Sequence, residues 1–249
     1  MIFPDRIKSI KPNYKVLEIG PGAYPHPRSN VFLDKNFTTN EAFIQSGYMK
    51  PIEILDKPIH YYDGRLFPFD DDEFDYVICS HVVEHVPIED LDLFISEIKR
   101  VSKHGGYLEF PNIYYELLCF PDGHQWFVNY RDKEILFLKR KEINENNILK
   151  IYHSMIYGND KYVYKIYNRY KEFFITGFEW TDNITYKIVN SFDELITHQD
   201  VEKWTKYFNN FQPEKEDISY PKIIPYFQYQ LKRIIRILKK MFRPISNFH

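Results

Sequence analysis

An acid followed by two closely spaced glycines lies near the start of the chain. In the run Val16-Leu17-Glu18-Ile19-Gly20-Pro21-Gly22, a short apolar stretch carries Glu18 near its end. Glycine lets the backbone turn sharply and approach a ligand closely, and ligands of parallel sheets bind beyond the carboxyl ends of the strands. We therefore expect a nucleotide-like cofactor at Glu18, Gly20, Pro21 and Gly22. A tight turn without any ligand is the alternative interpretation.

Two further residue types narrow the chemistry of this cofactor. A nicotinamide fingerprint needs a third glycine three residues after the second, and Pro25 occupies that position. An acid before the first glycine instead suits a cofactor with a cationic amino group. Asp34, followed by Lys35, ends the next apolar run, where an acid can accept hydrogen bonds from both ribose hydroxyls. A helix cap or a solvated loop acid is the alternative role for Asp34.

The elements that must position these residues alternate between strands and helices. The segment Glu89–Val101 has apolar residues at helical spacing and lies between two short apolar runs. This rhythm predicts right-handed parallel crossovers and an α/β sheet. The expected strands are Lys15–Ile19, Val31–Asp34, Ile59–Tyr62, Phe74–Ser80 and Gly106–Phe110.

The second half of the chain predicts two antiparallel hairpins. The first joins Trp126–Tyr130 to Glu134–Arg140, and the second joins Phe173–Trp180 to Ile184–Val189, each through a short polar turn. The segment between them, Lys141–Lys171, is polar and rich in tyrosine, and we interpret it as an irregular insertion.

Four motifs in order resemble the class I S-adenosylmethionine-dependent methyltransferases. The runs Asp63–Phe69 and Phe74–Ile78 are similar to that family's D-x-x-x-L-P-F and F-D-x-V, with an acidic turn between them. His81–Val86 is similar to its H-V-L-E-H-V. Ile98–Val101 and Gly105–Leu108 are similar to its R-V-x-x-x-G-G-x-L. The resemblance implies a Rossmann-like, mostly parallel sheet that ends in an antiparallel hairpin, has helices on both faces and is followed by a C-terminal helical extension.

The same resemblance assigns roles to individual residues around S-adenosylmethionine. Glu18 and the glycines would line its methionine end, and Asp34 would hold the ribose. Asp63 and Leu66 would lie at the adenine, while Ser80 and His81 would face both cofactor and substrate. The full set expected to bind the cofactor is Glu18, Gly20, Pro21, Gly22, Asp34, Lys35, Asp63, Gly64, Leu66, Ser80 and His81.

The chain departs from the family between the first two strands. Only Ala23–Asn30 separates Gly22 from the second strand, and this segment contains Pro25 and Pro27. Because proline breaks the interior of a helix, the family's usual first helix cannot reach full length here.

Three histidines are the candidates for removing a proton from the methyl acceptor, because histidine is the natural base near neutral pH. His81 directly follows the fourth strand, His85 lies one helical turn further, and His124 lies in a loop beside Trp126. A hydrogen bond to the next helix is the alternative role for His81, and a structural role is the alternative for the other two. The run Asp70–Asp72 resembles the family's ordinary acidic turn, so we expect no metal.

The identity of the acceptor stays open between three alternatives. The run ending at Asn112 and the His124-Gln125-Trp126 loop are similar to methyltransferase-domain proteins encoded with surface-glycan genes. That similarity implies O-methylation of a sugar hydroxyl in a polysaccharide or lipid-linked glycan. A small quinone-like or lipid-like acceptor is the second alternative. A non-catalytic methyltransferase-like binding module is the third.

The C-terminal residues form a separate basic region. We predict one methyltransferase domain over residues 1–211, with its motifs in 14–140, and then a linker and a basic amphipathic helix over 212–249. Such a helix can lie on anionic lipid or pack on the domain or on a second subunit in a homo-oligomer. Its basic residues are Lys232, Arg233, Arg236, Lys239, Lys240 and Arg243.

The composition excludes several other classes of protein. The net charge is −2 and the pI about 6.5, so we expect no nucleic-acid partner. Two cysteines that lie far apart form neither a disulfide framework nor a zinc pattern. The N-terminus has no apolar core of a signal peptide. We therefore expect a cytoplasmic protein that is peripheral at the inner membrane face if its tail binds lipid.

Overall fold

The computed structural model describes residues 3–22, 25–36, 57–119, 123–140 and 169–210. Contacts within the chain divide it into two units, Met1–Glu202 and Lys203–His249. The predicted insertion lies outside the described residues up to position 168, and so does the whole of the predicted linker and basic helix. Among the described residues, no helix combines the length and apolar character that a membrane crossing requires.

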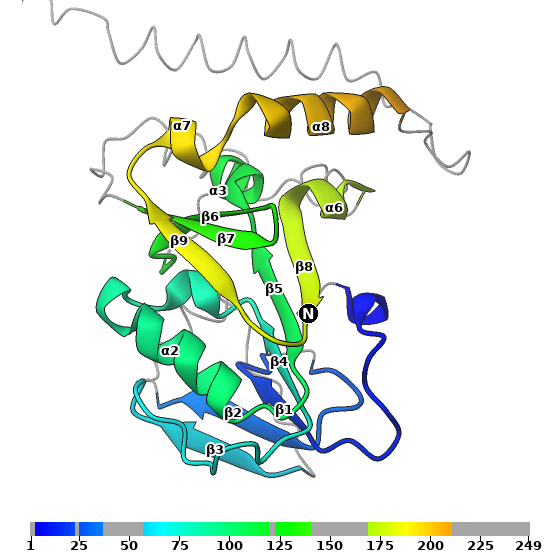
Figure 1. Ribbon diagram of the computed structural model, residues 1–249, viewed down its shortest axis with the longest axis vertical. Helices are drawn as coiled ribbons and strands as arrows, with labels where there is room; N and C mark the ends of the chain where they lie inside the picture. The colour runs from blue at the N-terminus through cyan, green and yellow to red at the C-terminus, as the bar shows by residue number, and fades with distance from the viewer. Residues whose placement is uncertain (1–2, 23–24, 37–56, 120–122, 141–168, 211–249) are drawn as a thin grey trace, which may run out of the picture. The chain divides into compact units, whose positions relative to one another are not determined.

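A six-stranded sheet forms the centre of the first unit (Figure 1). Its strand order is β3-β2-β1-β4-β5-β8, in which the first five strands are parallel and β8 is antiparallel to β5. The predicted α/β, Rossmann-like methyltransferase sheet is therefore confirmed. The bounds are Val16–Ile19 for β1, Val31–Lys35 for β2, Ile59–Tyr62 for β3, Tyr76–Ser80 for β4, Gly106–Pro111 for β5 and Ile175–Trp180 for β8.

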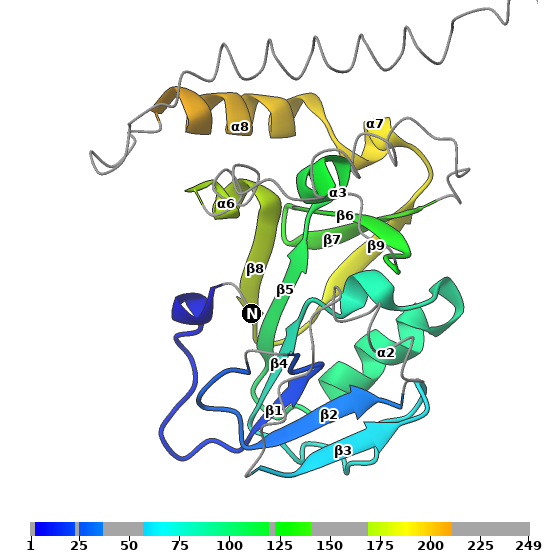
Figure 2. The same cartoon turned by 180° about the vertical axis from the view of Figure 1, so that it is seen from behind.

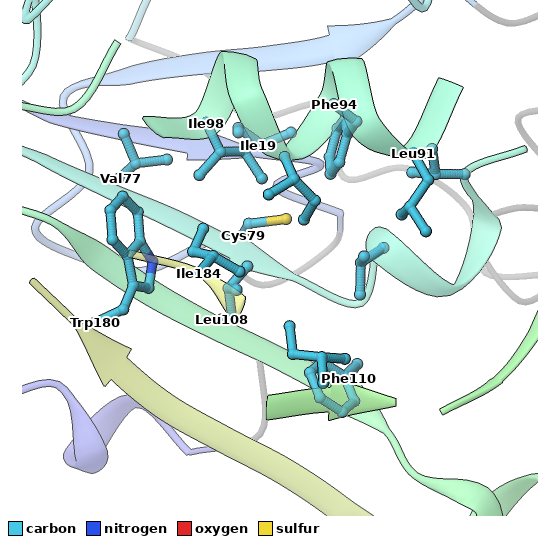
Figure 3. Close-up of a cluster of buried hydrophobic side chains, with 14 of the residues drawn as sticks. Ile19, Val77, Cys79, Leu91, Phe94, Ile98, Leu108, Phe110, Trp180 and Ile184 are labelled. Carbon is cyan, nitrogen blue, oxygen red and sulfur yellow. The ribbon is translucent and has the colours of Figure 1, made fainter. Parts of the chain in front are cut away.

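One face of this sheet is covered by helix α2, Ile88–Arg100. Its apolar stripe includes Phe94 and Ile98, which share one buried cluster with Ile19 and Cys79 of the sheet. Figure 3 shows α2 lying over these strands with the two sets of side chains facing each other. The helix carries acids in its first turn and bases in its last, which complements the helix dipole.

The opposite face of the sheet carries a different cover in the described residues. Tyr76, Ile78 and Tyr107 pack there against Ile7 and Ile10 of the N-terminal segment. That segment begins with a short 3-10 helix, η1, Pro4–Arg6, and then runs along the sheet to β1 (Figure 2). Alternate residues of β4 therefore serve two separate cores, as the two-residue period of a strand requires.

A second sheet of three strands has the order β6-β7-β9. The predicted hairpin of β6, Trp126–Arg131, and β7, Glu134–Lys139, is confirmed by their antiparallel pairing. The predicted second hairpin is wrong. Its two strands form, but β8 pairs with β5, whereas β9, Thr185–Val189, runs parallel to β7 in the second sheet.

The physical reason lies in what each strand packs against. At Gly105, with φ +97°, a Cβ atom would meet the carbonyl oxygen of Trp180, so the missing side chain lets the end of β8 approach β5 closely. Ile184, which follows the turn, is buried in the core under α2 rather than opposite β8. Packing at these two points outweighs the local tendency to close a hairpin.

Helices complete the described part of the chain. Helix α3, Ile113–Cys119, follows β5, and a 3-10 turn, η2, Val83–His85, follows β4. Three helices come after the insertion: α6, Lys171–Phe174, α7, Phe192–Leu195, and α8, His198–Asn210. The start of α8 is tied to β6, because Arg131 Nη1 lies 2.7 Å from Asp200 Oδ2.

Candidate functional site

Glu18 organises the short loop that replaces the first helix. Its side chain is buried, and its Oε2 accepts hydrogen bonds from the backbone N–H of His26 at 2.8 Å and from the Ser29 hydroxyl at 2.6 Å. Burial raises the pKa of Glu18, and these two hydrogen bonds act against that rise. Residues 25–30 contain no helix, which confirms the sequence prediction for this stretch. Glu18 thus holds the loop beside the glycine turn.

The glycine turn begins at the carboxyl end of β1. Gly20 has φ +61°, and its N–H donates to the carbonyl of Leu33 on β2 at 2.8 Å. A Cβ atom at Gly20 would lie 2.5 Å from Cγ2 of Val82, so a side chain is excluded by space as well as by conformation. Gly22 also has a positive φ of +54°. The turn therefore places two residues without side chains at the carboxyl end of β1.

Asp34 and Lys35 lie at the carboxyl end of β2, next to the ends of β1 and β3. Asp34 Oδ1 accepts the N–H of Lys35 at 2.8 Å, and burial raises the pKa of Asp34 to about 6. The Lys35 chain lies against Gly64, because a Cβ there would be 2.9 Å from Lys35 Cε. The structure therefore brings Asp34, Lys35 and Gly64 together, as the cofactor hypothesis requires.

A cavity of about 470 Å³ lies beside the end of β3. Leu66, which projects into solvent with 64% of its surface exposed, lines this cavity together with Asp63. The loop after Leu66 is fixed to α2, because Phe67 N donates to Glu97 Oε2 at 2.7 Å and Arg100 Nη1 donates to the Phe69 carbonyl at 2.8 Å. The cavity is lined by Tyr61, Tyr62, Asp63, Arg65, Leu66, Pro68 and Leu93.

Ser80 and His81 lie at the carboxyl end of β4, against Glu109 of β5. The Ser80 hydroxyl donates to Glu109 Oε1 at 2.8 Å, and the N–H of His81 donates to the Glu109 carbonyl at 2.8 Å. His81 has φ +58°, a left-handed conformation that is strained for a residue with a side chain. Strain of this kind concentrates at functional sites, so the end of β4 is a candidate for contact with the substrate.

Two carboxylates surround the imidazole of His81. Its Nε2 lies 3.3 Å from Glu109 Oε1 and its Nδ1 3.6 Å from Glu84 Oε1, and both contacts are ion pairs without hydrogen-bond geometry. Burial acts to lower the pKa of His81, but the two carboxylates outweigh it and raise that pKa to about 9. A side chain that is protonated at neutral pH cannot accept a proton, so this geometry does not support His81 as the base.

His85 and His124 form a separate pair whose rings lie at 86° with centroids 4.5 Å apart. His124 Nδ1 lies 2.6 Å from Glu116 Oε1, and Arg140 Nη1 lies 3.4 Å from the other Glu116 oxygen. Burial raises the pKa of Glu116, while His124 and Arg140 act to lower it. Burial lowers the pKa of His85 to about 4, so this imidazole is neutral at physiological pH.

The aromatic residue of the loop around His124 is part of the core. Trp126 is fully buried, and its indole N–H donates to the carbonyl of Val86 at 2.6 Å. The N–H of Gln125 donates to the carbonyl of Glu84 at 2.7 Å. These bonds fasten the start of β6 to η2, so Trp126 does not present a stacking surface to a sugar.

Three buried acids at this end of the sheet were not identified from the sequence. Glu109 carries a signal, because it is a charged residue inside the otherwise apolar strand Gly106–Pro111. Glu84 carries a weaker one as the acid between Val83 and His85. Glu116 carries none, because its contact with His124 exists only in the folded chain.

Comparison with known proteins supports the prediction at the level of the domain. Residues 44–110 match the family described as the methyltransferase domain. That range contains the motifs from Asp63 to Leu108, while the glycine turn and Asp34 precede it. The family match and the strand order agree with the predicted methyltransferase domain and with S-adenosylmethionine as its cofactor. No curated protein matches the chain.

Solved methyltransferases show a distant likeness. A SAM-dependent methyltransferase from Thermotoga maritima is 18% identical over 45% of this chain and 50% of its own, with a TM-score of 0.30. A SAM-dependent methyltransferase from Mesorhizobium loti is 10% identical over 51% and 57%, with a TM-score of 0.30. This chain thus spans about half the length of these two proteins. A complex containing the Trm112 methyltransferase activator of Haloferax volcanii matches at 15% identity over 70% and 84%, with a TM-score of 0.38.

Proposed function

We propose that this chain is an S-adenosylmethionine-dependent methyltransferase whose cofactor lies across the carboxyl ends of β1, β2 and β3. The observation that carries the proposal is the convergence of the Gly20 turn, Asp34 and the cavity beside Asp63 along one edge of the sheet. A turn without side chains suits the amino-acid part of the cofactor, an acid suits ribose hydroxyls, and a partly apolar cavity suits a base.

The methyl acceptor in this proposal is a hydroxyl group. In the finer form of the proposal, this hydroxyl belongs to a sugar of a polysaccharide or lipid-linked glycan. The finer form rests on the sequence resemblance around Asn112 and His124, because Trp126 is buried and offers no stacking surface. In-line methyl transfer mainly requires that the acceptor oxygen be held against the methyl group and lose its proton.

The three candidate histidines divide into two groups in this mechanism. His81, held as a cation by Glu84 and Glu109, can orient an acceptor oxygen by donating a hydrogen bond to it. His85 and His124 remain the candidates for handling the acceptor's proton, either directly or through a bound ion.

Calorimetric titration with S-adenosylhomocysteine tests the cofactor site. We expect micromolar binding by the full chain, at least tenfold weaker binding by Asp34→Ala, and no response to NAD. Asp193→Ala, which removes an exposed acid on α7, is the matched control and should bind like the unaltered chain. Absence of binding by the unaltered chain would overturn the proposal in favour of a non-catalytic binding module.

The acceptor is tested separately with labelled S-adenosylmethionine. We expect label to appear on sugar acceptors, with the product stable to alkali as a methyl ether is. Transfer only to quinol or lipid acceptors would refute the glycan form while leaving the methyltransferase proposal intact. The assay is repeated with His81→Ala and His124→Ala, each compared with His104→Ala, which alters an exposed histidine outside the site.

A further inference from the structure

Three side chains with metal-binding atoms gather between η2 and the start of β6. Glu84, His85 and His124 each offer one such atom, and these atoms all lie within 4.8 Å of one another. Two of the residues are adjacent in sequence, and the third comes from a different element that main-chain hydrogen bonds hold against η2. The cluster is therefore fixed by the fold rather than assembled by mobile side chains.

Glu84 is a buried carboxylate without a hydrogen-bond partner in the part of the chain that the structure describes. Its side chain is 1% exposed, and neither carboxylate oxygen has a hydrogen-bond partner among the described residues. The ion pair with His81 at 3.6 Å supplies charge but is too long to be a hydrogen bond. A buried charge is normally paired and hydrogen-bonded or coordinates a metal. The Glu84 carboxylate thus has coordination capacity that the side chains around it leave unused.

The histidines are each oriented by a hydrogen bond on the same ring nitrogen. His85 Nδ1 lies 3.2 Å from the carbonyl of Gly123, which can only accept, so the proton is on Nδ1. His124 Nδ1 lies 2.6 Å from Glu116, whose other oxygen faces Arg140. In His85 this leaves the lone pair on Nε2, and in His124 it does so when the Glu116 carboxylate is the acceptor. Carboxylates and backbone carbonyls bonded to the far nitrogen are the usual outer partners of metal-bound histidines.

We propose that Glu84, His85 and His124 form a binding site for a first-row divalent transition metal ion such as Zn²⁺. Two imidazoles and one carboxylate are the ligand set of both zinc hydrolase sites and non-haem iron sites. Ca²⁺ and Mg²⁺ are disfavoured, because they prefer oxygen ligands throughout. With bonds of about 2.1 Å, tetrahedral ligand atoms lie about 3.4 Å apart, so the three ligand atoms, which lie within 4.8 Å of one another, must approach each other further when an ion binds.

Three protein ligands leave at least one position of the ion for water or another small ligand. If an ion binds here, His85 and His124 cannot act as bases, because a ring nitrogen whose lone pair is bound to a metal cannot accept a proton. It would instead lower the pKa of an oxygen bound to it. The inference stands apart from the cofactor site, since none of the three ligands belongs to the cofactor-binding edge of β1, β2 and β3.

The test is a competition titration with Zn²⁺ and a chromophoric chelator, using the full chain after dialysis against a chelator. We expect one equivalent of Zn²⁺ per chain. Glu84→Gln, which keeps the size of the side chain but removes its charge, should weaken binding at least tenfold, as should His124→Ala. Glu116→Gln, which alters only the outer partner of His124, should weaken binding about 10- to 100-fold.

The matched control is His104→Ala, which removes a histidine with 43% of its side chain exposed and should bind Zn²⁺ like the unaltered chain. Addition of Co²⁺ should give visible absorption bands in the unaltered chain, and Glu84→Gln should lose them. Circular dichroism of each variant establishes that it is folded. If Glu84→Gln fails to fold, His124→Ala and Glu116→Gln decide the question.

Two results would overturn the inference: no stoichiometric Zn²⁺ binding by the unaltered chain, or binding that the folded ligand variants leave unchanged. Titration of the same metal-free protein with S-adenosylhomocysteine separates this outcome from the cofactor proposal. Failure of one site does not imply failure of the other.

Discussion

Replacement of Gly20 by alanine should destabilise the protein in a way that its neighbour Gly22 does not share. Both glycines have positive φ values, +61° and +54°, so both substitutions force an L-residue into the left-handed region. That conformational cost is about 1–2 kcal/mol. At Gly20 the new Cβ would also lie 2.5 Å from Val82 Cγ2, whereas at Gly22 the nearest atom among the described residues, chain neighbours aside, is 4.0 Å away.

The steric contribution can be estimated from the overpacking of cores, which costs about 1–3 kcal/mol. We therefore expect Gly20→Ala to lower the free energy of unfolding by about 2–5 kcal/mol, and Gly22→Ala by about 1–2 kcal/mol. Val82→Ala removes the obstructing methyl group. In the double variant Gly20→Ala/Val82→Ala, the steric part should be recovered as a coupling energy of about 1–3 kcal/mol.

Urea unfolding monitored by circular dichroism measures all four variants against the unaltered chain. The reasoning is refuted if the two glycine variants differ by less than about 0.5 kcal/mol, the usual limit of additivity, or if Val82→Ala does not rescue Gly20→Ala. Titration with S-adenosylhomocysteine then separates stability from function. If the turn binds the cofactor, the rescued double variant should fold normally and still bind weakly.

Two further predictions concern buried charges. Because burial raises the pKa of Asp34 to about 6, its carboxylate is protonated as the pH falls below that value, and cofactor affinity should drop about tenfold between pH 7 and pH 5. Calorimetry at several pH values should show this loss of affinity in the unaltered chain and not in Asp34→Asn. An affinity that does not change with pH in either protein would contradict the prediction. Arg131→Met should lower the free energy of unfolding by about 3–5 kcal/mol, because it leaves the buried carboxylate of Asp200, which also accepts hydrogen bonds from Thr197, without its cationic partner at 2.7 Å. Arg131→Met/Asp200→Asn removes the charge but keeps an acceptor oxygen for Thr197, and should recover part of that loss in thermal unfolding. A double variant no more stable than the single one would rule out the buried-charge explanation.

The parallel strands could be predicted because their sequences have the pattern of strands that are buried on both faces of a sheet. Val16–Ile19 and Tyr76–Ser80 are short, apolar and bounded by polar or glycine residues, and a strand buried on both faces has this pattern. The helix Ile88–Arg100 repeats its apolar residues at helical spacing, so its position was also predictable to within one residue.

The separation of β8 from β9 could not be predicted because it is decided by distant residues. Locally, residues 173–189 contain two strand-forming runs joined by a polar turn, which is the pattern of a hairpin. The outcome depends on the open edge of β5, on the absence of side chains at Gly105 and on a place for Ile184 in the main core. None of these contacts leaves a signal within the segment itself.

The roles of the histidines were likewise beyond the sequence, because they depend on which carboxylate faces each ring. His81 is one of three candidate bases in the sequence, on the ground of its position after the fourth strand. The structure places its ring between two acids, one of which lies inside an apolar strand, and these acids raise the pKa of the imidazole. Position along the chain predicts that His81 follows the fourth strand but not which charged groups face its ring.

The segment from the end of β4 through η2 connects the candidate functions of this protein. Its Val82 packs on the glycine turn, its His81 reaches Glu109 on the sheet, and its Glu84 faces the pair formed by His85 and His124. Glu84 takes part in two of these functions. Its carboxylate forms an ion pair with His81 at 3.6 Å, and it is the anionic ligand of the proposed metal site.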